Sequence, residues 1–145
     1  MKRTATAHWK GDGMSGTGSL STQSGALKEQ PYSFKTRFGS EDGKAGTNPE
    51  ELLGAAHAGC FSMALSFMLS ENKFAVDDIM TTASVEVQNK NGGFEIVEIV
   101  LNLKAKIPGI TQEKFQELSA AAKAGCPLSK ALASTKITLV SELMN

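Results

Sequence analysis

The feature that most constrains this chain is a long apolar segment, Leu52–Leu69, in which nearly every residue is apolar or small. Three polar side chains interrupt it: His57, Ser62 and Ser66. Apolar residues would cover almost the whole circumference of a helix formed by this segment, so we expect a sheet or a second subunit to enclose it. The polar interruptions favour a buried core helix over a membrane span.

A strong start signal precedes this segment. Asn48 is a good N-cap residue, Pro49 follows at the first helical position, and Glu51 stands three residues after the cap. The pattern predicts a helix from Pro49 to about Ser70.

Short segments separated by glycines precede the helix and indicate strands. They are Thr4–Trp9, Thr17–Thr22 and Pro31–Phe38. In the third segment Tyr32 and Phe34 alternate with polar residues, which predicts that Arg37 lies on the opposite, accessible face.

A β-hairpin is predicted after the helix. Ile79–Gln88 alternates as a half-buried strand, Asn91-Gly92-Gly93 makes the turn, and Phe94–Ile107 returns. The apolar alternation of the returning strand changes phase near Val97-Glu98. One extra residue there, a β-bulge, would explain the change.

The C-terminal part contains two helices and a strand. We expect a helix capped by Thr111 and closed by Gly125, a short helix opening at Pro127, and a strand over Ile137–Leu143. Hairpins clustered around one long central helix indicate an α+β fold with antiparallel sheets. No long linker or repeat divides the chain, so we expect a single domain over residues 1–145.

Charge and composition exclude several function classes. Fifteen basic residues balance fifteen acidic ones, which argues against nucleic acid as a partner. The first residues lack the apolar segment of a signal peptide, and no membrane partner is expected. We therefore predict a cytoplasmic protein, in which thiols stay reduced.

The two cysteines are the strongest candidates for chemistry. With only two cysteines and two histidines, a four-ligand zinc site is not expected, and no cofactor is indicated. Cys126 lies at the start of a predicted helix, where unpaired N–H groups favour a thiolate. Cys60 lies among apolar residues, which raise a thiol pKa, so it needs a cation or a hydrogen-bond donor, unless both cysteines are inert core residues.

Arg37 is the candidate cation, because its guanidinium always keeps its charge. Glu50 or Glu51 could hold it as a bidentate partner. Glu50 and Cys60 are about 15 Å apart along a straight helix. Either the helix breaks, or Arg37 bridges the gap, or another subunit supplies one member. His57, on the same helix face as Cys60, is either an auxiliary base or a core histidine.

Two motifs resemble those of one known family. The segment GTNPEELLGAAHAGCFSMA, Gly46–Ala64, closely resembles the active-cysteine helix of the OsmC/Ohr family, and AGCPLS, Ala124–Ser129, looks like its second cysteine motif. Ala7-His8-Trp9 and Pro31–Phe38 look like the osmotically inducible (OsmC) branch rather than the Ohr branch. The similarity spans essentially the whole chain.

The resemblance implies an intertwined homodimer with active sites at or near the subunit interface. It also implies a peroxidase role in oxidative or osmotic stress, in which one cysteine attacks the peroxide, the second resolves the product, and an arginine–glutamate pair assists. Carried over, these residues are Cys60, Cys126, Arg37 and Glu50, with His57 and Glu51 as possible auxiliaries.

The expected reaction is the reduction of organic hydroperoxides through a Cys60 sulfenic acid and a Cys60–Cys126 disulfide, which a lipoyl-type or other dithiol reopens. Four apolar residues would line the substrate site, although core packing explains them as well: Phe38, Leu53, Phe61 and Met63. Two alternatives stay open. One is a thiol–disulfide oxidoreductase, and the other is a non-enzymatic redox sensor or ligand-binding protein switched by the same cysteines.

Overall fold

The computed structural model describes all 145 residues and divides the chain into two compact units, Met1–Leu52 and Leu53–Asn145. The boundary falls inside the long helix α2 (Pro49–Glu71). The single domain expected over residues 1–145 stays a prediction, and each unit is described by itself.

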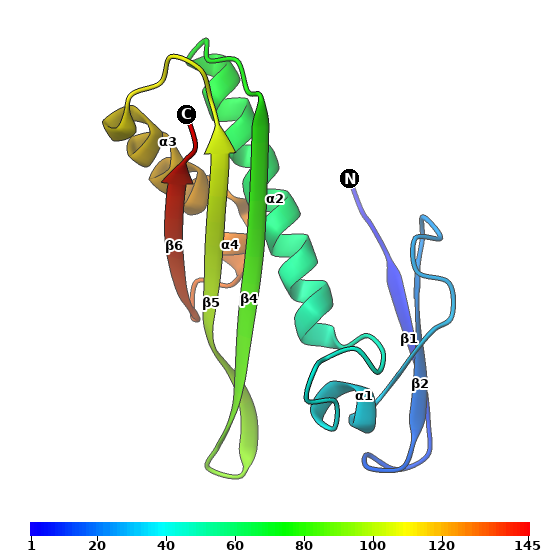
Figure 1. Cartoon of the computed structure of the whole chain (residues 1–145). Coiled ribbons are helices and arrows are strands. Elements are labelled where there is room, and N and C mark those ends of the chain that lie inside the picture. Colours follow the sequence, from blue (N-terminus) through cyan, green and yellow to red (C-terminus); the bar gives the residue numbers. More distant parts are fainter. The chain divides into compact units, whose positions relative to one another are not determined.

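The first unit contains a small antiparallel sheet and one short helix (Figure 1). Its strands are β1 (Ala5–Lys10), β2 (Thr17–Thr22) and β3 (Gln30–Ser33), paired in the order β1-β2-β3. All six residues of β1 are exposed, and no apolar side chain of the unit is buried. This unit therefore lacks a hydrophobic core of its own.

The strand predicted over Pro31–Phe38 is wrong in its second half. The chain leaves the sheet after Ser33 and forms helix α1 (Phe34–Phe38). Ser33 Oγ accepts from the N–H of Thr36, and Thr36 Oγ1 accepts from the N–H of Ser33. This capping box overrides the alternating pattern, and Arg37 consequently lies on a helix.

The second unit contains most of α2 and a sheet of three strands, β4 (Asp78–Lys90), β5 (Gly93–Lys106) and β6 (Lys136–Leu143). Helices α3 (Gln112–Gly125) and α4 (Pro127–Ala131) connect β5 to β6. The three helices lie on one face of the sheet (Figure 1). The core lies between them, and its largest members include Phe61, Leu65, Leu101, Leu103 and Phe115.

The predicted hairpin and its bulge are confirmed. Asn91 and Gly92 connect β4 to β5 with positive φ values of 53° and 82°, as a two-residue type I′ turn requires. Glu86 pairs with Glu98 and Val87 with Ile96, which leaves Val97 as the extra residue of the bulge.

The α+β class is confirmed, but one pairing departs from the antiparallel expectation. β6 runs parallel to β5, with Ile99 opposite Ile137. A parallel pair needs a long crossover connection, and α3 and α4 supply it. The second sheet is therefore mixed.

Helix α2 begins and ends close to the predicted residues, and this chain encloses one of its faces, while enclosure by a second subunit stays a prediction. Phe61, Leu65 and Leu69 are 0% exposed, whereas Met63 and Phe67 are each 65% exposed. The helix is long and apolar enough to cross a membrane by composition, with a mean hydropathy of 1.6. Burial of one face in a protein core marks it instead as the core helix of this unit.

Candidate functional site

The two cysteines meet inside the second unit. Cys60 lies in the middle of α2, and Cys126 separates α3 from α4. Their sulfur atoms are 2.8 Å apart, and both are free thiols. A disulfide bond is about 2.05 Å long, so a small movement joins them. The pair can therefore pass between the dithiol and disulfide states.

The surroundings shift the two thiols in opposite directions. Burial raises the pKa of Cys60, and the neighbouring Cys126 raises it further. Burial acts in the same sense on Cys126, but hydrogen bonds from Cys60 and from the Ser129 and Leu128 groups outweigh it and lower the pKa of Cys126. These directions agree with the contrast expected from the sequence between an apolar site and a helix start.

A buried histidine stands behind Cys126. His57 Nε2 lies 2.8 Å from Ser129 Oγ, and the Ser129 hydroxyl in turn lowers the pKa of the Cys126 thiol. His57 is 0% exposed, and its Nδ1 has no partner. Burial lowers the pKa of His57, so the ring is neutral near pH 7. Sequence reasoning missed Ser129, although a residue three positions after Cys126 at a helix start was the available signal.

Arg37 and Glu50 form the predicted ion pair within the first unit. Arg37 Nε lies 3.1 Å from both carboxylate oxygens of Glu50, and Nη2 lies 2.5 Å from Oε1. The carboxylate group is largely buried, with 11% of its side chain exposed, against 34% for Arg37. Glu51 instead accepts a hydrogen bond from Thr47 Oγ1. Glu50 is therefore the partner that holds the guanidinium.

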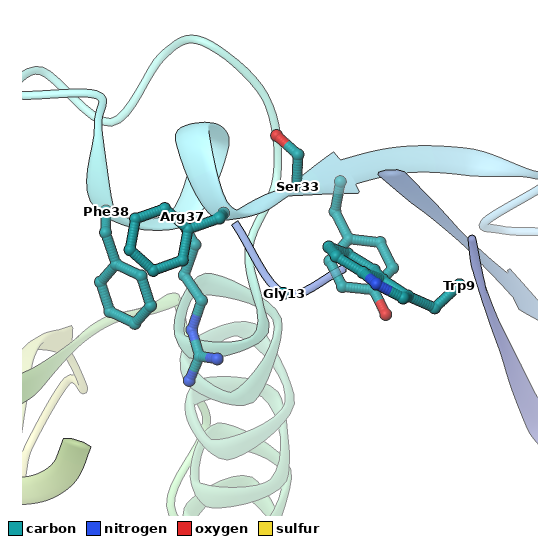
Figure 2. Close-up of a pocket in the computed structure, with 7 residues that line it drawn as sticks. Trp9, Gly13, Ser33, Arg37 and Phe38 are labelled. Atoms are coloured by element: carbon teal, nitrogen blue, oxygen red, sulfur yellow. The ribbon is translucent and has the colours of Figure 1, made fainter. Parts of the chain in front are cut away.

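An aromatic pocket of about 220 Å³ borders this arginine. Figure 2 shows Arg37 and Phe38 together on α1, with Trp9 of β1 farther along the pocket. The guanidinium carbon lies 4.7 Å from the centroid of the Phe38 ring. The full lining is Trp9, Gly13, Tyr32, Ser33, Phe34, Arg37 and Phe38. The pocket offers apolar surface beside a fixed positive charge.

The other predicted lining residues lie in different surroundings. Phe61 belongs to the core and is 0% exposed, so it offers no surface to a substrate in this structure. Met63 is 65% exposed on the outer face of α2, and Leu53 is half-buried. Sequence reasoning found Phe38 but missed Trp9 and Tyr32, which come from separate strands.

No group of three or more His, Cys, Asp and Glu side chains is arranged to hold a metal ion. The chemistry available to these residues is that of thiols, a guanidinium and a neutral imidazole.

Sequence comparisons connect this chain with known proteins. A family model described as OsmC-like protein matches residues 40–140. The Peroxiredoxin OsmC of Escherichia coli (strain K12) is 50% identical over 137 residues, which are 94% of this chain and 93% of that protein. The organic hydroperoxide resistance protein OhrB of Bacillus subtilis (strain 168) is 40% identical over 93 residues, or 63% of this chain and 65% of that protein.

Solved structures share the fold. The structure of the organic hydroperoxide resistance protein OhrB of Bacillus subtilis has a TM-score of 0.71 at 28% identity and covers 96% of this chain and 98% of its own. An organic hydroperoxide resistance protein OsmC from Legionella pneumophila has a TM-score of 0.72 at 27% identity, with 97% of each chain covered.

Proposed function

Because this chain belongs to the OsmC-like protein family, we propose that it is a cysteine-based peroxidase that reduces organic hydroperoxides to alcohols. The observation that carries the proposal is the 2.8 Å approach of the Cys60 and Cys126 sulfurs. The names of the relatives, a peroxiredoxin and an organic hydroperoxide resistance protein, support the choice of substrate.

The first step is attack by Cys60. Its thiolate bonds to the terminal oxygen of the hydroperoxide, the O–O bond breaks, and the leaving alkoxide takes a proton to become the alcohol. The Cys60 sulfur becomes a sulfenic acid. Cys60 is the attacking thiol because it is partly exposed, whereas Cys126 is 0% exposed.

Arg37 is the proposed activating cation. Burial raises the pKa of Cys60, and a guanidinium beside the thiolate would oppose that shift. It would also stabilise the negative charge that develops on the leaving oxygen. Glu50 acts as the positioning residue, because both of its carboxylate oxygens contact the Arg37 guanidinium and fix its orientation. Arg37 serves the Cys60 of its own chain or that of a second copy.

The second step regenerates a stable thiol pair. The Cys126 thiolate attacks the sulfenic sulfur, the S–S bond forms, and the departing hydroxide takes a proton to become water. This protects Cys60 from irreversible oxidation. A dithiol, of the lipoyl type or another small class, then reduces the disulfide by exchange and is itself oxidised.

The aromatic pocket supports organic over inorganic peroxides. Its apolar rings would bury an alkyl or aryl tail while the peroxide group stays near Arg37. Hydrogen peroxide has no tail to bury, so it gains nothing from that surface.

We propose that the working form is a cytoplasmic homodimer. The first unit has no buried apolar side chain, and Met63 and Phe67 expose a large apolar face of α2. Small sheets need an apolar partner surface for stability, and a second copy of this chain supplies one. The single domain over residues 1–145 would then be completed by the partner.

Steady-state turnover tests the function. With cumene hydroperoxide and dihydrolipoamide or dithiothreitol, we expect continuous peroxide consumption, faster than with hydrogen peroxide. A redox sensor would react once and stop, and a thiol–disulfide oxidoreductase would reduce a disulfide substrate without peroxide. Either result would refute the proposal.

A further inference from the structure

The side chains of His57 and Ser129 connect α2 to the residues beside the second cysteine inside the second unit. His57 Nε2 lies 2.8 Å from Ser129 Oγ, and Ser129 stands three residues after Cys126 at the start of α4, where its hydroxyl lowers the pKa of the Cys126 thiol. All three residues are buried, with exposed fractions of 0%, 7% and 0%. The peroxidase mechanism above assigns no role to His57 or Ser129.

Counting the available protons shows which group donates and which accepts between His57, Ser129 and Cys126. A hydroxyl has one proton to donate. If Ser129 donates it to the Cys126 thiolate, its oxygen must accept from the ring, so His57 carries its proton on Nε2. Nδ1 is then the bare acceptor nitrogen. This fits the unpartnered, buried state of Nδ1, because a buried acceptor without a partner is less unusual than a buried N–H without one.

We propose that His57 is a positioning residue that turns the Ser129 hydroxyl onto the Cys126 sulfur and so sets the rate of disulfide formation and reduction. The inference rests on the proposed function and deepens it: the pair controls the second cysteine and not the attack on peroxide. The Ser129 hydroxyl thereby favours the thiolate form of Cys126, which is the form that attacks the Cys60 sulfenic acid.

The same hydrogen bond helps in the reductive half of the cycle. When a dithiol attacks the Cys60 sulfur of the disulfide, Cys126 departs as a thiolate, and a leaving thiol of lower pKa leaves faster. Because Cys60 is partly exposed and Cys126 is buried, the reductant reaches Cys60 and Cys126 is the leaving group. One hydroxyl thus assists both directions of the redox cycle.

Four substitutions test the inference: two remove a hydrogen-bonding group, and two replace it with a similar one. Ser129→Ala removes the hydroxyl, and His57→Leu removes the ring donor at similar volume. Ser129→Thr keeps a hydroxyl, and His57→Gln keeps an N–H donor. Ser119→Ala is the matched control, because Ser119 is also a buried serine, with 0% exposure, but its hydroxyl has no partner.

The first measurement is the ultraviolet absorbance of the Cys126 thiolate against pH, with each variant combined with Cys60→Ser. We expect Ser129→Ala and His57→Leu to raise the pKa of Cys126, and the rescues and Ser119→Ala to leave it near that of the Cys60→Ser parent. This measurement needs no peroxide, so it tests the inference even if the proposed function fails. An unchanged titration in both removal variants would overturn the inference.

The second measurement separates the two chemical steps with Cys60 present. After one equivalent of cumene hydroperoxide, trapping with dimedone follows the sulfenic acid as it decays to the disulfide. A tenfold loss of thiolate slows disulfide formation about threefold, because a more basic thiolate is also a better nucleophile. Cys60 oxidation should slow less. Equal slowing of both steps, in removals and rescues alike, would indicate a merely structural role and contradict the proposal. No oxidation of Cys60 in the unaltered protein would instead refute the proposed function.

Discussion

Cys60 and Cys126 have sulfurs 2.8 Å apart but differ in access: Cys60 is partly exposed, whereas Cys126 is 0% exposed. Access from solvent is therefore greater for Cys60 than for Cys126. The two thiols also differ in pKa: burial raises the pKa of Cys60, whereas hydrogen bonds lower that of Cys126. Access therefore favours attack by Cys60, and the lowered pKa favours Cys126 as the resolving thiol, which are the two roles proposed above.

Cysteine substitutions should separate these two roles. Cys60→Ser is expected to abolish peroxide consumption, because no other accessible thiol exists. Cys126→Ser should consume about two equivalents and then stop, because one equivalent forms the Cys60 sulfenic acid and a second oxidises it to the inactive sulfinic acid. Peroxide assays and intact mass spectrometry measure both outcomes. Equal, full activity of the two variants would exclude the mechanism.

Arg37 should control the reactivity of Cys60. Arg37→Ala is expected to raise the pKa of Cys60, because the burial effect is then unopposed, and to slow peroxide attack about a hundredfold or more. Glu50→Gln should have a smaller effect of the same sign, because the guanidinium stays but its charged anchor is lost. Alkylation of Cys60 against pH, in the Cys126→Ser background, measures the pKa.

Lys35→Ala is the control for Arg37→Ala, since Lys35 is an exposed cation on the same helix α1. It should leave the alkylation profile unchanged. If Lys35→Ala and Arg37→Ala shift it equally, the effect is one of general surface charge and Arg37 has no special role.

Local patterns predicted the elements that local chemistry decides. Helix α2, the Asn91-Gly92 turn and the bulge at Val97 all depend on neighbouring residues, and the structure agrees. The pairing direction of β6 depends instead on where α3 and α4 carry the chain, which no local pattern contains. The prediction for the end of β3 was wrong for another reason. The Ser33–Thr36 capping box was present in the sequence, but an aromatic alternation obscured it.

The residues of the candidate site also differ in how far the sequence alone identifies them. Single residues with a distinctive chemistry, Cys60, Cys126, Arg37 and Glu50, could be selected from sequence, and the structure places them as two pairs. Ser129 was missed: its place three residues after Cys126 was a signal, but its hydrogen bond to His57, which lies 72 residues away in sequence, is visible only in the structure.

His57 should make stability depend on pH. Burial lowers the pKa of His57 from 6.5, so the unfolded chain takes up its proton at a higher pH than the folded one. Between those two pKa values the unfolded state binds more protons, and the free energy of unfolding falls as the pH drops below about 6.5. His57→Gln cannot titrate and should lose this component, as seen in denaturant unfolding across pH. His8→Gln, at an exposed strand position, should behave as the unaltered chain; parallel curves for all three proteins would contradict the prediction.

The outer face of α2 should be the surface on which a second copy packs. Met63 and Phe67 lie four residues apart on one side of the helix, and each is 65% exposed, an unfavourable arrangement unless a partner covers it. Phe67→Asp would place a charge in that interface, so we expect dimers to dissociate into monomers, measured by light scattering during size-exclusion chromatography. Ser134→Asp, in the exposed turn before β6, adds the same charge away from this face and should stay dimeric. A monomeric unaltered chain, or a Phe67→Asp variant that stays dimeric, would contradict this interface. Another surface would then have to stabilise the β1–β3 sheet, because the first unit has no buried apolar side chain of its own.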